Sequence, residues 1–150
     1  MRLIYGDLFD VLDQTDGPVV LGHGVNAEGI MGAGIAAQFR VRYPEMHNNY
    51  ASLCKDGSLR PGDSWIWHED GDRVHIANLV TQDKPGPNAA YRWVGQSLRA
   101  VAAWAEQECI PEIHIPKIGC GIGGLDWEGV AEEIASVEDI FNVEVVVWSL

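Results

Sequence analysis

Two glycine-rich segments contain the residue types that could do chemistry in this chain. The first, Leu21–Tyr43 (LGHGVNAEGIMGAGIAAQFRVRY), has five glycines ahead of a run in which bulky residues recur every four positions. This pattern predicts a loop without large side chains that opens into an amphipathic helix. The free N–H groups at the start of such a helix, and the positive end of its dipole, favour an anion. We therefore expect the backbone around Gly32–Gly34 to bind phosphate.

The second segment, Lys117–Trp127 (KIGCGIGGLDW), repeats this design after another apolar run. Turn chemistry alone is the simpler explanation of one glycine loop, but two such loops that both follow predicted strands favour a phosphate site. Cys120 stands inside the second loop with no histidine beside it in sequence, so its backbone N–H is the expected contribution rather than a thiolate nucleophile. Neither segment ends in Gly-Lys-Ser/Thr or matches the dinucleotide-binding fingerprint, which disfavours a kinase or a dehydrogenase.

Short apolar runs alternate with helical patterns along the chain and predict the elements that position these loops. Strands are expected near Leu3–Tyr5, Val19–Gly22, Ser64–Trp67, Val74–Asn78, Ile113–Pro116 and Val143–Trp148. Helices are expected at Pro44–Cys54, at Ala89–Glu108 and from Trp127 onwards. We predict an α/β fold with three layers, α/β/α, around a mixed, largely parallel six-stranded sheet. Both glycine loops then meet in one crevice at the carboxyl ends of the strands.

The composition narrows the classes of function. At 150 residues the chain fits one domain, 1–150, with no apolar run long enough to span a membrane and no signal layout at its N-terminus. A soluble, cytoplasmic protein is therefore expected. The 22 acidic and 10 basic residues give a net charge of −12, which disfavours direct binding of duplex nucleic acid. The three cysteines and five histidines show no metal-ligand spacing, so we expect no metal and no cofactor, and no feature identifies a protein partner.

Five segments together resemble the macrodomain family, whose fold binds ADP-ribose. They are IYGDLFD at the first strand, GHGVN, MGAGIAAQFRVRYP, PKIGCGIGGLDWEGV and the final VVVWSL, and the likeness covers almost the whole chain. The MGAGIA, GCG and LDW segments resemble one branch in particular. That branch contains the terminal ADP-ribose protein glycohydrolase, the DarG-type antitoxins that remove ADP-ribose from DNA, and the yeast-type ADP-ribose-1″-phosphate phosphatase. The resemblance implies a single macrodomain that binds ADP-ribose or an ADP-ribosyl derivative.

The resemblance also assigns ligand-binding residues by position. Asp7 would accept a hydrogen bond from the adenine amino group, with Leu8 beside it, and Trp148 would lie against the adenine ring. The simpler alternatives are a turn-capping carboxylate and a core tryptophan. Asn26 would hydrogen-bond the hydroxyls of the distal ribose. The diphosphate would lie among residues of both loops: Met31, Gly32, Gly34, Ile35, Gly119, Cys120, Gly121, Ile122 and Gly123.

The catalytic positions are where the chain departs from these relatives. The resemblance aligns a lysine of the glycohydrolase and antitoxin with Gln82, and an aspartate of the glycohydrolase with Gly123, so a lysine-dependent mechanism is not supported. Lys84 is close in sequence, but neighbouring prolines limit its freedom. His23 instead matches a histidine of the phosphatase and would be a base or a nucleophile, with Asp126 as an acid or as its orienting partner. The alternatives are a hydrogen-bonded structural histidine and a helix cap.

We therefore predict an enzyme, an ADP-ribose-1″-phosphate phosphatase or a mono-ADP-ribosyl hydrolase. It would remove a group from C1″ of the distal ribose: a phosphate, an acyl group or the ester to a protein carboxylate. The bound diphosphate would hold that carbon against His23 or a fixed water, so positioning would supply much of the rate. One alternative is a reader that binds ADP-ribose without turnover. Another is an antitoxin or anti-defence protein that reverses ADP-ribosylation of nucleic acid or consumes a nucleotide signal.

Overall fold

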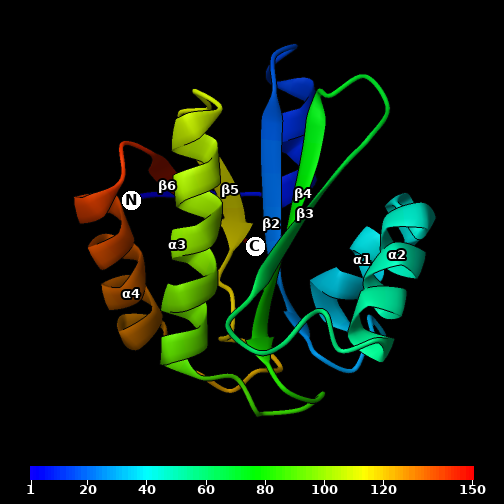
Figure 1. Cartoon of the computed structure of the whole chain (residues 1–150). Helices are drawn as coiled ribbons and strands as arrows, with labels where there is room; N and C mark the ends of the chain where they lie inside the picture. The colour runs from blue at the N-terminus through cyan, green and yellow to red at the C-terminus, as the bar shows by residue number, and fades with distance from the viewer.

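The computed structural model describes every residue from Met1 to Leu150 and contains one six-stranded sheet, in the order β1-β6-β5-β2-β4-β3 (Figure 1). The strands are β1 (Arg2–Tyr5), β2 (Val19–Asn26), β3 (Ser64–His68), β4 (Val74–Gln82), β5 (Glu112–Pro116) and β6 (Glu144–Ser149). All neighbouring strands are parallel except β3, which is antiparallel to β4. The predicted mixed, largely parallel sheet is confirmed.

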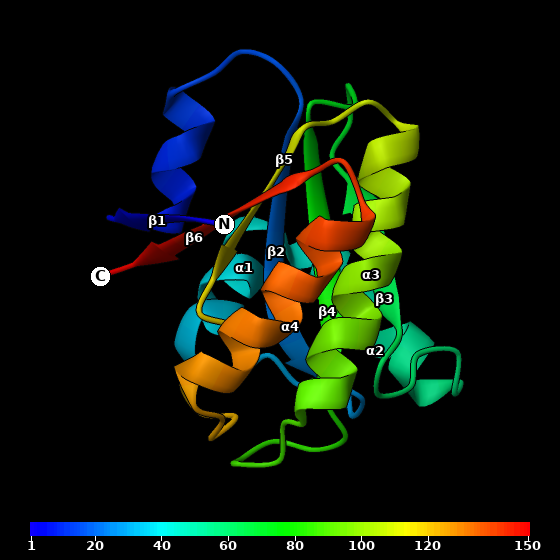
Figure 2. The same cartoon turned by 90° about the vertical axis from the view of Figure 1, so that its left-hand side faces the viewer.

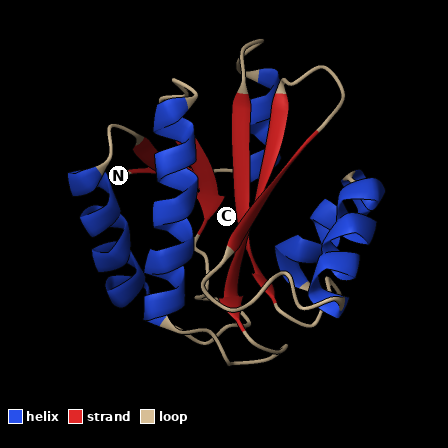
Figure 3. Cartoon of the chain, viewed as in Figure 1, coloured by secondary structure: helices blue, strands red, loops and turns tan.

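Helices cover both faces of this sheet. One face packs against α1 (Gly34–Arg42), α2 (Pro44–Lys55) and the short 3-10 helix η1 (Leu8–Asp13), and the other against α3 (Tyr91–Gln107) and α4 (Trp127–Ile140). Figure 3 shows the resulting three layers, and Figure 2 shows β1 and β6 side by side at one edge of the sheet. No helix is both long and apolar enough to cross a membrane. The predicted α/β/α architecture is confirmed.

Two hydrophobic cores, one on each side of the sheet, follow from the alternation of side chains along the strands. In β2, Val19, Leu21 and Val25 belong to the core under α1 and α2, whereas Val20 belongs to the core under α3 and α4. These side chains are almost completely buried, so burial of apolar surface holds the helices on the sheet.

The strand β2 is longer than predicted, and this changes where the first glycine loop begins. It continues past its predicted end because Gly22–Val25 pair in register with Ala77–Val80 of β4. The glycines permit close packing inside the strand, since a Cβ at Gly22 would lie 2.9 Å from the Ile115 side chain. His23 therefore lies in the middle of a central strand and not at the mouth of a loop.

Candidate functional site

Two cavities lie next to each other at the carboxyl ends of the strands, on either side of the start of α1. The larger, here the Trp148 cavity, has a volume of about 580 Å³ and is lined by residues that include Asp7, Leu8, Gly34, Ile35, Cys120, Gly121 and Trp148. The smaller, here the Asn26 cavity, has a volume of about 160 Å³ and is lined by residues that include Asn26, Gly32, Ala33, Gln82 and Ile122. Both glycine loops border both cavities, so the structure brings together the two segments that the sequence places in one crevice.

The two glycine loops touch each other between the cavities. The Ile122 side chain is 55% exposed, and its Cδ1 lies 3.5 Å from the position that a Cβ would take at Gly34. Gly34 has a φ of +61°, a conformation that favours glycine. Ala33, the N-cap of α1, offers no side-chain capping bond. The first N–H groups of α1 therefore remain available to a ligand.

Asp7 and Trp148 border the Trp148 cavity, and each also has a structural role. Asp7 caps a helix and Trp148 packs in the core, the two roles that the sequence also allows as alternatives to ligand binding. Asp7 Oδ1 accepts a hydrogen bond from the Phe9 backbone N–H (2.9 Å) and so caps η1, which leaves Oδ2 for another donor. Trp148 is 4% exposed and packs in the core, as does Leu8 beside it. The geometry is compatible with ligand contact at these three residues, and that contact stays a prediction.

Asn26 ends β2 and folds the turn that follows it. Its Oδ1 accepts from the backbone N–H groups of Glu28 (3.0 Å) and Ile30 (3.3 Å), and its Nδ2 donates to the Ile30 carbonyl (2.8 Å). Tyr50 of α2 donates its hydroxyl to the Asn26 backbone carbonyl. The side chain is thus held at the edge of the cavity, with one amide N–H left for a ligand.

Three of the predicted diphosphate contacts, Met31, Gly119 and Gly123, line neither cavity. Met31 is 1% exposed and packs in the core under α1 and α2. A Cβ at Gly123 would lie 2.7 Å from the Gly119 carbonyl and 2.9 Å from the Ala89 side chain. These residues shape the two loops by packing, and their contact with a diphosphate stays a prediction.

Gln82 is a cavity residue that the sequence prediction did not include among the ligand contacts. It ends β4, lines the Asn26 cavity and donates through Nε2 to the carbonyls of Lys84 (2.7 Å) and Gly86 (3.1 Å). Its Oε1 lies 3.1 Å from the position that a Cβ would take at Gly123. Gln82, which aligns with the lysine of the relatives, and Gly123, which aligns with the aspartate, are therefore neighbours in the fold. Lys84 is exposed and lines neither cavity. The available signal was the place of Gln82 at the carboxyl end of a strand, where it pairs with Asn26 at the end of β2.

His23 lies in the core and lines neither cavity. Its ring is 0% exposed, stacks on Phe39 of α1 with centroids 4.0 Å apart, and places Nε2 at 2.7 Å from Asn78 Oδ1. Burial lowers the pKa of His23 from 6.5 to about 4, although the hydrogen bond to Asn78 opposes the shift. Since Asn78 Oδ1 only accepts, the neutral ring donates from Nε2. This geometry fits the structural alternative for His23 and does not fit direct contact with a substrate.

Asp126, the second catalytic candidate, and the thiol of Cys120, a residue expected to contribute only its backbone N–H, are also poorly placed for acid, base or nucleophilic chemistry. Asp126 is exposed at the N-cap of α4, makes no capping bond with its side chain and lines neither cavity. No hydrogen bond or ion pair joins it to His23. Cys120 lines the Trp148 cavity, but burial raises the pKa of its thiol, which disfavours a thiolate.

The charges at the two cavities differ. Lys117 is the basic side chain that lines the Trp148 cavity, with its Nζ 5.2 Å from the centre of the Trp127 ring. In the Asn26 cavity no lining side chain is titratable. No group of three or more His, Cys, Asp or Glu side chains lies close enough to hold a metal ion. The arrangement suits an anionic, partly aromatic ligand that is bound by backbone N–H groups and amides.

Comparison with known proteins identifies the family. The Macro domain model matches residues 23–134, most of the chain, and the chain belongs to the Macro domain family. It is 34% identical to the ADP-ribose 1''-phosphate phosphatase of Candida albicans over 97% of this chain and 99% of that protein. It is 32% identical to the DNA ADP-ribosyl glycohydrolase of Mycobacterium tuberculosis over 83% of this chain, which corresponds to 36% of that longer protein.

The solved structures agree with this assignment. The macrodomain of Mycobacterium tuberculosis DarG matches with a TM-score of 0.82 and 29% identity, over 99% of this chain and 98% of that one. The family and the branch that the sequence resembles are therefore confirmed.

Proposed function

We propose that this chain binds ADP-ribose or an ADP-ribosyl derivative across the two cavities and hydrolyses the group on C1″ of the distal ribose. One observation carries the proposal: both glycine loops meet at the start of α1, between a cavity bordered by Asp7 and Trp148 and a cavity bordered by Asn26. The adenosine occupies the Trp148 cavity, and the diphosphate accepts hydrogen bonds from the uncapped N–H groups of α1. The distal ribose occupies the Asn26 cavity.

The Trp148 cavity offers a physical reason for each part of an adenosine diphosphate. The free Oδ2 of Asp7 accepts from the exocyclic amino group, which distinguishes adenine from a base with a carbonyl at that position. The indole of Trp148 offers an aromatic surface to the base. Lys117 brings a positive charge to the cavity of a chain whose net charge is −12, and so offsets part of the repulsion of an anionic ligand.

The chemical step in this proposal depends on positioning rather than on a side-chain acid or base. No titratable side chain lines the Asn26 cavity, and neither His23 nor Asp126 reaches it. The remaining amide N–H of Asn26 and the Oε1 of Gln82 hold the ribose and a water against C1″, and proximity lowers the barrier. The water oxygen bonds to C1″ as the C1″–O bond to the leaving group breaks, and the leaving group keeps that electron pair and takes up the proton that the water releases. His23 then acts through the fold by holding β2 to β4 and α1.

The relatives favour phosphate as the leaving group. The Candida phosphatase matches over nearly the full length of both chains, whereas the match to the DNA glycohydrolase covers 36% of that protein. A net charge of −12 also disfavours a nucleic-acid strand as the carrier of the ADP-ribose. Acyl and protein-ester groups at C1″ belong to the same substrate class.

A second candidate is a reader that binds ADP-ribose without turnover. The observation that favours it is the lack of titratable side chains in the Asn26 cavity. Gln82 lines this cavity in place of the lysine of the resemblance, and Gly123, next to Gln82, stands in place of the aspartate. Both candidates share the cytoplasmic location expected from the sequence, which cell fractionation tests.

Turnover of a substrate panel separates the two candidates. The wild type is incubated with ADP-ribose 1″-phosphate, an acyl ADP-ribose, an ADP-ribosylated acidic peptide and ADP-ribosylated DNA, while calorimetry measures the binding of ADP-ribose. Binding with release from a 1″ substrate supports the enzyme, binding without release supports the reader, and no binding contradicts both.

Two variants serve as controls in this panel. Gly34→Val places a β-branched residue at a φ of +61° and distorts the phosphate loop, so binding and release should both be lost. His23→Gln retains a donor for Asn78, so release should stay within about threefold of the wild type if His23 acts only through the fold. A collapse of release in His23→Gln, with affinity intact, would restore His23 to the chemical step.

A further inference from the structure

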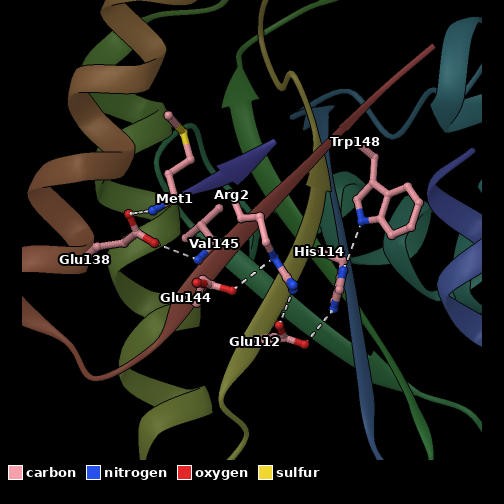
Figure 4. Close-up of polar contacts among 8 residues, drawn as sticks. All are labelled: Met1, Arg2, Glu112, His114, Glu138, Glu144, Val145 and Trp148. Carbon is pink, nitrogen blue, oxygen red and sulfur yellow. Dashed lines mark hydrogen bonds and ion pairs between the residues drawn. The ribbon is translucent and has the colours of Figure 1, made fainter. Parts of the chain in front are cut away.

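A line of polar contacts leads from Trp148, at the proposed adenine site, towards the opposite end of the sheet (Figure 4). The indole N–H of Trp148 donates to Nδ1 of His114, 3.0 Å away, and Nε2 of His114 lies 3.5 Å from Oε1 of Glu112. Arg2 pairs with Glu112 and, at 3.3 Å, with Glu144. Trp148 and His114 are 4% and 6% exposed, so their hydrogen bond is made inside the protein with little competition from water.

This hydrogen bond fixes both the proton on His114 and the orientation of the indole. Because Nδ1 accepts, the neutral imidazole carries its proton on Nε2, the nitrogen near Glu112. The two backbones are also fixed, since Trp148 of β6 pairs with Pro116 of the parallel strand β5, two residues beyond His114. The side-chain bond therefore selects one orientation of the ring that borders the Trp148 cavity.

His114 can take up a proton without opening the nucleotide site. A separate cavity of about 470 Å³ lies at the amino ends of the strands and is lined by residues that include Arg2, Glu112 and His114. Trp148 borders this cavity as well as the Trp148 cavity, so the indole separates the two.

We propose that His114 is a positioning residue for nucleotide binding: the neutral imidazole holds the Trp148 indole in the orientation that receives the adenine, and protonation of His114 releases it. A protonated imidazole carries an N–H on each nitrogen, so its Nδ1–H would point at the indole N–H and the hydrogen bond would be lost. The inference rests on the proposed function because it places the adenine at Trp148.

The surrounding charges set the direction of this pH dependence. Burial lowers the pKa of His114 below its ordinary 6.5; Glu112 opposes this shift, Arg2 adds to it, and Glu144 opposes it. Residues of η1, of the segment after it and of β2 also line the separate cavity, and none of them is charged. Because this pKa lies below 6.5, His114 is neutral near pH 7, and the indole is released only as the pH falls through the lowered pKa.

The affinity for ADP-ribose across pH tests the proposal. ADP-ribose lacks the phosphate monoester of the 1″-phosphate, which titrates near pH 6 and would confuse the result. Wild-type affinity should fall about threefold to tenfold as the pH is lowered from neutral through the pKa of His114, which lies below 6.5. His114→Asn keeps an acceptor near the position of Nδ1 but does not titrate, so its affinity should stay level, whereas His114→Leu should bind weakly throughout. His68 is an exposed histidine outside these cavities, so His68→Asn should keep the wild-type dependence of affinity on pH.

The indole N–H resonance of Trp148 gives a second readout that needs no ligand. Assigned by its loss in Trp148→Phe, it should move with pH in the wild type, with a midpoint below 6.5, and stay in place in His114→Asn. Equal pH profiles of affinity in the wild type and His114→Asn, or an indole resonance that does not titrate in the wild type, would overturn the proposal alone. A wild type that binds no ADP-ribose while its indole resonance titrates would overturn the proposed function and, with it, the nucleotide part of this inference.

Discussion

His23 links the folding stability of this protein to pH. The ring is fully buried between Phe39 and Asn78, and burial lowers its pKa to about 4. In the unfolded chain a histidine takes up its proton near pH 6.5. Between these two values the unfolded state binds more protons than the folded state, so the free energy of unfolding decreases as the pH falls.

The magnitude follows from the two pKa values of His23. One pKa unit corresponds to about 1.4 kcal/mol, so the shift from 6.5 to about 4 amounts to about 3 kcal/mol once the pH is below both values. Between about pH 7 and pH 4.5 the same shift removes about 2.5 kcal/mol. Domains are typically stable by about 5–15 kcal/mol, so a loss of this size is measurable.

Urea unfolding of the wild type and of His23→Gln at a series of pH values isolates this contribution. Glutamine offers Asn78 an amide N–H but does not titrate, and all other ionisable groups, His114 included, are common to both proteins and cancel in the difference. The wild type should lose about 2.5 kcal/mol more than the variant between about pH 7 and pH 4.5. Parallel pH dependence of the two proteins would refute the reasoning, because His23 would then protonate as easily in the folded state as in the unfolded chain.

Three further predictions concern the cavities. Asp7→Asn keeps the cap of η1, so calorimetry should show about tenfold weaker ADP-ribose binding with little change in melting temperature, and an unchanged affinity would limit Asp7 to capping. Lys117→Met should weaken ADP-ribose binding about threefold to tenfold at low salt and less at high salt. Lys55→Met makes the same change of charge at the end of α2 and should leave the affinity unchanged. Equal effects of the two variants would mean that net charge alone is responsible. Gly123→Ala should lower the free energy of unfolding in urea by about 1–3 kcal/mol, because the added methyl group meets a backbone carbonyl at 2.7 Å; wild-type stability would mean that the loop yields without cost.

The strands and helices were predictable because the apolar pattern of each element records which face it buries. The run Val143–Trp148 becomes β6 (Glu144–Ser149), with residues of both cores, as its nearly continuous apolar character indicates. The end of β2 was not predictable in this way. The glycines of GHGVN indicate a loop locally, but Gly22–Val25 are held in the sheet by pairing with β4, a contact between segments far apart in sequence.

The site was predictable to the extent that it consists of backbone and loop residues. The glycine loops meet where the carboxyl ends of parallel strands require them to meet. The roles of individual side chains depend on tertiary packing, and His23 shows the difference: its residue type suggests a base, while its environment of Phe39 and Asn78 makes it a core residue. Gln82 was overlooked because its place in the Asn26 cavity depends on the fold of the loop after β4.

The most direct test of the central claim, that ADP-ribose lies across the start of α1 between the two cavities, is a nitrogen–proton correlation spectrum recorded as ADP-ribose is added. We predict the largest changes at the backbone N–H groups of Gly34, Ile35 and Ile122, with smaller changes at the residues around Asp7 and Asn26. Saturating ADP-ribose that leaves these resonances in place, or that moves only those around the distant cavity of His68 and Trp104, would contradict the account.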